Sequence, residues 1–161
     1  MRLTIRTNLA MRSLMFCAIN AGRTVRKSEI AENCNASENH LAQVINTLSQ
    51  RGYIETRRGR AGGMQLARAA SEISVGAVFR DFEGGLPFAE CFDAEANTCP
   101  LAQGCMLRTA LAKALEAFFG ELDRYSLADL VDNNDRLEEI LLLPEGIPPV
   151  SACSHRISAR A

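Results

Sequence analysis

The stretch that decides the fold is residues 27–52, which read KSEIAENCNASENHLAQVINTLSQRG. It predicts a short helix from about Lys27, a turn at residues 34–36, and a second helix with Ser37 as its N-cap. On the second helix, apolar residues recur at i, i+3, i+4 and i+7 and turn one face toward a core: Leu41, Val44, Ile45 and Leu48. The opposite face is polar. Two helices joined by a tight turn, with a polar outer face on the second, predict a helix-turn-helix.

A basic hairpin is predicted immediately after this unit. Residues 53–56 and 64–66 indicate two short strands around the segment RRGRAGG at residues 57–63. The glycines of that segment permit the positive backbone angles that a hairpin tip needs. The expected fold is therefore mainly α with a small β-hairpin wing, which is a winged helix-turn-helix.

Further helices are predicted on both sides. One runs from Thr7, as its N-cap, to Asn20, and a short one runs from about Ser74 to Phe82. An irregular stretch follows, with glycines and prolines that oppose regular structure: Gly84, Gly85, Pro87 and Pro100.

A long helix is expected from about Cys105 to Tyr125. Its apolar residues trace one face, which we expect to bury itself against the same helix of a second chain: Leu107, Leu111, Ala114, Leu115, Phe118 and Leu122. Packing on its own domain is the alternative. Ser126 is expected to cap a further short helix, Leu127 to Asn133.

The expected organisation is therefore a winged helix-turn-helix domain over residues 1–82 and a cysteine loop over residues 83–104. Residues 105–143 would form the dimerisation helix and C-terminal helices, and residues 144–161 a disordered tail.

Charge is divided unevenly along the chain. Residues 1–70 carry 11 Lys or Arg against 4 Asp or Glu, whereas residues 71–161 carry 7 against 15. The basic half is thus the candidate for binding double-stranded DNA, although a solvated charged surface has the same composition. We expect the polar helix face and the hairpin to contact DNA through Ser37, Asn39, His40, Gln43, Arg57, Arg58, Arg60, Gly62 and Gly63.

Other classes of protein fit less well. No apolar run reaches the roughly 18 residues of a membrane span, and the short apolar stretch Leu14 to Ile19 is explained by a helix, so a cytoplasmic protein is expected. An enzyme is not expected, since the chain has two histidines and neither a G-x-G-x-x-G nor a Walker pattern.

The six cysteines differ in kind. Reducing cytosol disfavours a disulfide framework, which leaves metal binding or redox sensing. Cys17 and Cys34 lie in predicted helices and Cys153 in the tail, while the remaining three form the pattern Cys91-x7-Cys99-x5-Cys105. We interpret this trio as the site, with three unrelated buried thiols as the alternative.

An iron-sulfur cluster, either 2Fe-2S or 4Fe-4S, suits the trio better than zinc does. Structural zinc sites commonly use closely paired ligands and four protein donors, and neither feature is present. Soft thiolates on a loop, one followed by Pro100, are typical of iron-sulfur ligand loops. A structural zinc-containing DNA-binding protein stays an alternative. The fourth ligand is left open among Asn8, Glu90, Asp93, Glu95, water and a small thiol.

The chain as a whole resembles the iron-sulfur winged-helix repressors, a group that includes the nitric-oxide sensor NsrR, the iron-responsive RirA and the cluster-homeostasis regulator IscR. The resemblance covers roughly residues 1–131 and rests on MRLT at the N-terminus, the helix-turn-helix, the wing RGRAGGMQL at 58–66, the three cysteines and YSLADL at 125–130. It implies a homodimer that binds palindromic operators, with the cluster near the dimer interface.

Two segments and one position bear on which member of this group the chain resembles most. ENHL at 38–41 and DRYSLADL at 123–130 look most like NsrR, whose cluster resembles one completed by an aspartate of the partner's first helix. The matching position here is Asn8, and asparagine there looks more like RirA. The resemblance favours a repressor that responds to nitric oxide, with an iron-responsive or cluster-homeostasis regulator as the alternative.

Overall fold

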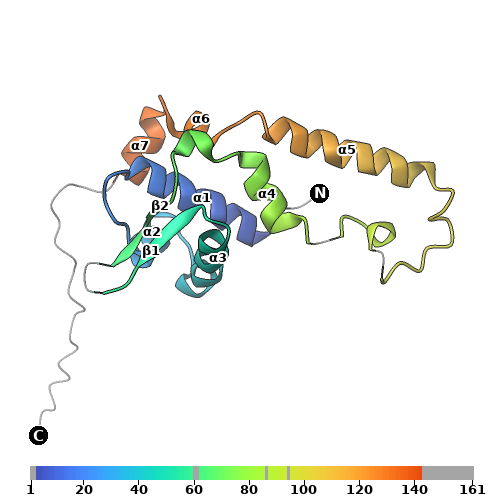
Figure 1. Ribbon diagram of the computed structural model, residues 1–161, viewed down its shortest axis with the longest axis horizontal. Coiled ribbons are helices and arrows are strands. Elements are labelled where there is room, and N and C mark those ends of the chain that lie inside the picture. Colours follow the sequence, from blue (N-terminus) through green and yellow to red (C-terminus); the bar gives the residue numbers. More distant parts are fainter. Residues whose placement is uncertain (1–2, 60–61, 86, 94, 143–161) are drawn as a thin grey trace, which may run out of the picture.

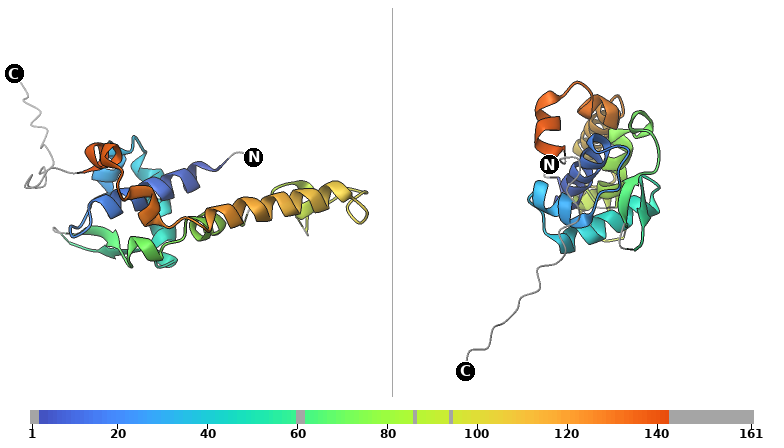
Figure 2. Two further views of the ribbon diagram at one scale, coloured as in Figure 1. Left: turned by 90° about the horizontal axis from the view of Figure 1, so that it is seen from above. Right: turned by 90° about the vertical axis from the view of Figure 1, so that its left-hand side faces the viewer.

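The computed structural model describes residues 3–59, 62–85, 87–93 and 95–142. It is mostly helical with one two-stranded antiparallel hairpin, which confirms the expected fold class. Figure 1 shows a compact body at one side and a long helix that extends away from it, and the two further views of Figure 2 show the same division. The predicted tail lies outside the described residues.

The helix-turn-helix consists of α2 (Lys27–Asn33) and α3 (Glu38–Gln50). Asn35 has φ +47° in the turn between them, a conformation that asparagine tolerates better than most residues. Ser37 occupies the N-cap position of α3, but its side chain makes no capping hydrogen bond. Leu41, Val44 and Leu48 are fully buried, so the predicted apolar face of α3 does point into the core.

The wing consists of β1 (Ile54–Arg57) and β2 (Gly63–Leu66), paired from Ile54 opposite Leu66 to Arg57 opposite Gly63. Its tip requires glycine. Gly59 has φ +108°, and its carbonyl accepts a 2.9 Å hydrogen bond from the amide of Gly62. A β-carbon at Gly62 would lie only 2.8 Å from that same carbonyl oxygen, so the loop closes more tightly than a side chain would allow.

Helix α1 (Ile5–Ile19) passes through the centre of the body, where Leu14 and Phe16 are fully buried. The predicted N-cap was wrong: Thr4 caps the helix, and its hydroxyl accepts a hydrogen bond from the amide of Thr7 at 3.2 Å. Thr7 is itself buried, and its hydroxyl donates to the carboxylate of Glu83. Thr7 therefore lies inside the first turn of the helix, and its amide is the group that Thr4 caps.

The second half of the chain begins with a short 3-10 helix, η1 (Ala70–Glu72), and then α4 (Val75–Glu83), whose N-cap Ser74 accepts a hydrogen bond from Ala77. A loop with one 3-10 turn, η2 (Glu90–Phe92), leads to α5 (Met106–Leu122). Helices α6 (Leu127–Val131) and α7 (Asp135–Leu141) return to the body, where the side-chain amide of Asn20 donates to the carbonyl of Leu141 at 2.9 Å.

Helix α5 ends at Leu122, earlier than the predicted Tyr125. The residues after it pair with the segment before α4: Val75 donates to the carbonyl of Tyr125 at 2.9 Å, and Ser74 and Ser126 form an isolated β-bridge. This pairing requires extended backbone and therefore stops the helix.

The residue that follows α5 also leaves no room for a side chain at Gly76 in α4. A β-carbon there would lie 2.8 Å from the backbone nitrogen of Asp123 and would overlap its carboxylate. We expect Gly76→Ala to lower the free energy of unfolding by about 1–3 kcal/mol, because overpacking outweighs the better helix propensity of alanine.

Gly120→Ala is the matched control, since nothing lies within 4 Å of a β-carbon at Gly120 on α5. It is expected to raise stability by roughly 0.5–1 kcal/mol. Denaturant titrations at one protein concentration compare the two variants. A Gly76→Ala protein as stable as the wild type would contradict the close packing of α4 against the end of α5.

Candidate nucleic-acid interface and cysteine loop

The polar face of α3 is open to solvent. The four residues of this region that are expected to contact DNA are all exposed on or just before this helix, and among the described residues their side chains have no hydrogen-bond or ion-pair partner: Ser37, Asn39, His40 and Gln43. The start of the helix is fixed by an ion pair of 3.0 Å between Lys27 of α2 and Glu38. Free amide and imidazole groups on a rigid helix are suited to hydrogen bonding with base edges.

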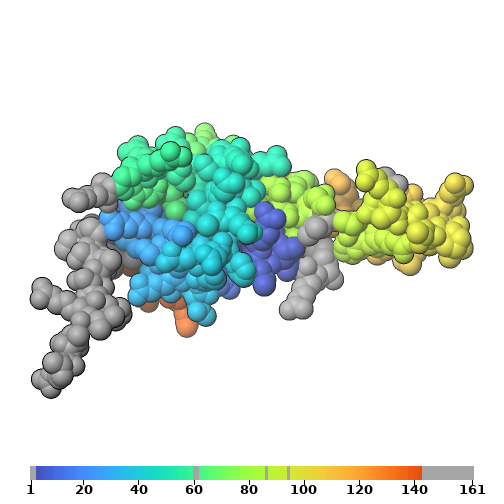
Figure 3. All heavy atoms as spheres, turned by 90° about the horizontal axis from the view of Figure 1, so that it is seen from below, coloured from blue at the N-terminus to red at the C-terminus, as the bar shows by residue number. Residues whose placement is uncertain are grey.

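The wing adjoins this helix. Figure 3 shows α3 and the hairpin together on one face of the body. Arg57 and Arg58 are exposed, and no acidic side chain of the described residues pairs with either of them. Arg60 lies outside the described residues. Two guanidinium groups without acidic partners are available for phosphates.

Gly62 and Gly63, also predicted to contact DNA, are partly buried. Gly63 lies where β2 meets Thr24 and Val25; a β-carbon there would approach the Thr24 methyl group to 2.7 Å. The amide of Met64 donates to the carbonyl of Val25 at 2.7 Å, and the amide of Val25 donates to the carbonyl of Met64 at 2.9 Å. The structure thus gives both glycines a role in shaping and seating the hairpin.

The base of the wing depends on two residues that the sequence did not single out, Tyr53 and Asp81. The Tyr53 hydroxyl donates to Asp81 at 2.7 Å, and Arg51 pairs with the same carboxylate at 3.5 Å. Arg68 lies over the Tyr53 ring, 4.9 Å from its centroid. Burial, together with the hydrogen bond to Asp81, raises the pKa of Tyr53, so its hydroxyl stays a donor. No local sequence pattern links residues 28 positions apart.

The three clustered cysteines are partly exposed. Cys91 lies in η2, Cys99 follows in the loop, and Cys105 is the N-cap residue of α5. Cys17 and Cys34, by contrast, are buried in the body. Burial, helped by the neighbouring Cys34, raises the pKa of Cys17 to about 12, and burial also raises the pKa of Cys34. These two thiols stay protonated, which makes them poor metal ligands. Cys153 lies outside the described residues.

Short-range hydrogen bonds organise the loop between Cys91 and Cys99. Glu90 accepts from the amide and hydroxyl of Thr98 at 2.9 and 2.6 Å. Asp93 accepts from the amides of Glu95 and Ala96 at 2.9 and 3.0 Å. These bonds lower the pKa of both carboxyl groups. Glu90 and Asp93, two of the candidate fourth ligands, thus each use one carboxylate oxygen to shape the loop, and Glu95, a third candidate, is exposed.

Within the part of the chain that the structure describes, no three His, Cys, Asp or Glu side chains come together in a way that could hold a metal ion. The cysteine loop instead lies beside α5, as Figures 1 and 2 show. Two hollows occur there. One is mainly apolar and is lined by Leu3, Phe88, Ala114, Leu115 and Phe118. The other shares Phe88 and Leu115 with it and is also lined by Gly84, Gly85, Pro87, Phe92 and Asp93.

Asn8, the remaining protein candidate for a fourth ligand, is exposed near the start of α1. Next to it in the chain, Thr7 bonds Glu83, the last residue of α4. The start of α1 is thereby tied to the point where the cysteine loop begins.

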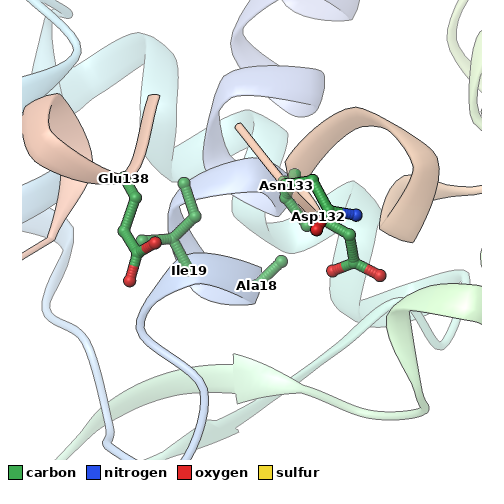
Figure 4. Close-up of a pocket in the computed structure, with 6 residues that line it drawn as sticks. Ala18, Ile19, Asp132, Asn133 and Glu138 are labelled. Carbon is green, nitrogen blue, oxygen red and sulfur yellow. The ribbon is translucent and has the colours of Figure 1, made fainter. Parts of the chain in front are cut away.

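Another hollow lies at the opposite end of α1. Figure 4 shows Ala18, Ile19, Asp132, Asn133 and Glu138 around it, and Val131 completes its lining. It contains two exposed carboxylates and no residue of the predicted sites. Among the described helices, none is both long and apolar enough to cross a bilayer.

The known proteins that this chain resembles are transcriptional regulators. The profile of the Rrf2 family, described as iron-dependent transcriptional regulators, matches residues 3–133. Protein aau3 of Rhizobium meliloti (strain 1021) is 42% identical over 154 residues, which cover 96% of this chain and all of aau3. The HTH-type transcriptional regulator NsrR of Geobacillus kaustophilus is 44% identical over 142 residues, 88% of this chain and 97% of that protein.

Solved structures share the architecture. The structure of T. potens IscR superposes with a TM-score of 0.63 at 26% identity, and the alignment covers 91% of this chain and 94% of the other. The similar proteins are transcriptional regulators and not enzymes, in agreement with the sequence-based expectation.

Proposed function

Since this chain belongs to the Rrf2 family of transcriptional regulators, we propose that it is a homodimeric repressor whose iron-sulfur cluster controls DNA binding in response to nitric oxide. The observation that carries the proposal is the contrast among the cysteines. Three partly exposed thiols lie on one loop between the body and α5, while Cys17 and Cys34 are buried with raised pKa values. The similarity to NsrR supports nitric oxide as the signal.

The DNA-binding half of the proposal rests on one surface. The polar face of α3 and the hairpin that carries Arg57 and Arg58 lie on one face of the body, so base-reading and phosphate-binding elements share that face (Figure 3). The protein reads sequence through α3 and fixes its position on the duplex through the wing.

The exposed apolar stripe of α5 supports the homodimer. None of its 17 residues is fully buried, and Leu107 is 65% exposed although it begins the apolar stripe. Helix α4 covers only the far end of that stripe, where the Phe79 and Phe118 rings meet at 6.2 Å. A second copy of α5 covers the rest, which removes apolar surface from water.

The donor set fits an iron-sulfur cluster. Cys91, Cys99 and Cys105 would supply three soft thiolate ligands from one partly exposed loop, whereas zinc in structural sites commonly takes four protein ligands. When bound, the cluster supplies irons that react with nitric oxide. The three cysteine thiolates would hold those irons, and the hydrogen bonds of Glu90 and Asp93 shape the loop that carries Cys91 and Cys99.

Asn8 supports one second candidate, a repressor that responds to iron availability. A neutral amide binds iron more weakly than a carboxylate, and Asn8 is exposed and available. A weakly held fourth position favours loss of the cluster when iron is scarce.

Anaerobic purification tests the cluster directly. We expect a brown protein whose visible absorbance accompanies comparable amounts of iron and acid-labile sulfide. A colourless protein with stoichiometric zinc would instead establish a structural zinc site and exclude cluster-based sensing.

The DNA-binding surface is tested with a duplex selected from a random-sequence library by the cluster-loaded protein. Arg58→Ala is expected to weaken binding severalfold and to flatten the plot of log affinity against log salt by about one unit per protomer, since one phosphate contact is lost. Fluorescence anisotropy at several salt concentrations measures both.

Gln43→Ala on α3 is the control. We expect it to relax preference for the selected sequence over a scrambled duplex while it leaves the salt slope unchanged. A wild-type salt slope in the Arg58→Ala protein would contradict the assignment of the wing to phosphate binding.

A further inference from the structure

Three charged residues at the end of α4 each bind a different part of the molecule. Arg80 faces the exit of α5, Asp81 faces the DNA-reading elements, and Glu83 faces the start of α1. The helix is anchored by Val78 and Phe82, both buried, and its last residue is followed at once by the cysteine loop. Figure 1 shows α4 between the body and α5.

The contact on the DNA-reading side is made by Asp81. One oxygen of its carboxylate accepts the hydroxyl of Tyr53, the residue immediately before β1, at 2.7 Å. The other oxygen lies 3.5 Å from Arg51, the C-cap residue of α3. A single carboxylate therefore binds both the end of the proposed recognition helix and the beginning of the wing.

The contact on the loop side is made by Glu83. Its carboxylate accepts hydrogen bonds from the amide of Thr4 at 2.8 Å, from the Thr4 hydroxyl at 3.0 Å and from the buried hydroxyl of Thr7. The first turn of α1 is thus held to the residue from which the cysteine loop departs.

The contact with α5 is made by Arg80. Its guanidinium forms two hydrogen bonds with the carboxylate of Asp123, at 2.5 and 2.7 Å, just after α5 ends. Such bidentate pairs fix orientation as well as distance. Together the three contacts connect the C-terminal end of α5 and the start of the cysteine loop to the DNA-reading face through one short helix.

We propose that α4 couples the cysteine loop to the DNA-reading elements, with Asp81 as the positioning residue that sets α3 and the wing through Arg51 and Tyr53. This rests on the proposed function. A change in loop shape moves the end of α4 at Glu83, and Asp81, two residues earlier, moves with it. Since Asp81 binds both DNA-reading elements, their relative orientation changes, and this orientation determines how well both engage one operator half-site.

The test compares Tyr53→Phe with Tyr125→Phe. Tyr53→Phe removes only the hydroxyl that bonds Asp81. Tyr125→Phe is the matched control, since Tyr125 is the only other tyrosine of the chain, is exposed, and its hydroxyl has no partner among the described residues. The measured quantity is the ratio of dissociation constants for the selected duplex between cluster-free and cluster-loaded protein. Loss of stability alone would affect both states and leave this ratio unchanged.

We expect a wild-type ratio of at least about tenfold, a ratio of roughly threefold or less for Tyr53→Phe, and a wild-type ratio for Tyr125→Phe. Asp81→Asn, which loses the ion pair with Arg51, should also lower the ratio. Glu55→Gln, at an exposed position on β1, also removes one negative charge and therefore controls for the change in net charge. Iron content and visible absorbance should match the wild type in all four variants. Wild-type ratios in both Tyr53→Phe and Asp81→Asn would overturn the coupling role.

Hydrogen exchange provides a readout without DNA. Loading the cluster should change the exchange of residues 53–57 in the wild-type and Tyr125→Phe proteins, and the change should be lost in Tyr53→Phe. Unaltered exchange in the wild type would overturn the proposed coupling. If exchange responds but duplex affinity does not, the coupling stands and the proposed cluster-dependent repression fails.

Discussion

Replacing any one of Cys91, Cys99 and Cys105 by alanine is expected to remove most of the bound iron and sulfide. The three thiols are the soft donors of one loop, whereas the other two described thiols, Cys17 and Cys34, are buried in the body. The effect should be equal at the three positions, because they act as one ligand set. Iron and sulfide analysis of anaerobically purified variants, normalised to protein, measures it.

Cys17→Ala, Cys34→Ala and Cys153→Ala are the controls and should retain their iron. Cys17 and Cys34 are held protonated in the core by burial, so their removal affects packing and stability but not ligation. Full iron retention in the Cys99→Ala protein would falsify the proposed site. Loss of iron in Cys34→Ala with unchanged folding would place a ligand in the body of the protein instead.

Local periodicity was sufficient to predict the DNA-reading part of the fold. The spacing of Leu41, Val44 and Leu48 fixed the buried face of α3, and the same spacing left Asn39 and Gln43 exposed. These features depend only on residues a few positions apart, which is why the sequence alone indicates them.

Features that depend on distant partners were missed. Thr4 and Thr7 are both acceptable N-caps by residue type, and the hydroxyls of both bond Glu83, a partner far along the chain that no local pattern reveals. The end of α5 is likewise set by the pairing of Ser126 with Ser74. The sequence predicted which residues form the DNA-reading face, but not that Asp81 holds the end of α3 and the start of the wing. That the three cysteines bind one cluster stays a prediction.

The second large effect concerns the switch itself. We expect the cluster-loaded dimer to bind its selected duplex at least tenfold, or about 1.4 kcal/mol, more tightly than cluster-free or nitrosylated protein. The cysteine loop joins α4 of the body to α5, which carries the proposed dimer contact, so loop shape affects the distance between the two copies of α3. Two half-sites about one helical turn apart require a fixed separation, and a small displacement therefore weakens binding at both.

Three states of the same preparation separate the candidate signals: cluster-loaded protein, protein after stoichiometric nitric oxide, and protein incubated anaerobically with an iron chelator. Loss of duplex binding with nitric oxide alone supports a nitric-oxide-responsive repressor. Loss with the chelator alone supports an iron-responsive one, and Asn8→Asp should then slow the loss, because a carboxylate holds iron more firmly than an amide. A ligand shifts an equilibrium only as far as its affinities for the two states differ. Equal affinity in all three states would therefore mean that the cluster does not distinguish the two DNA-binding conformations, and repression by this chain would have to be controlled elsewhere.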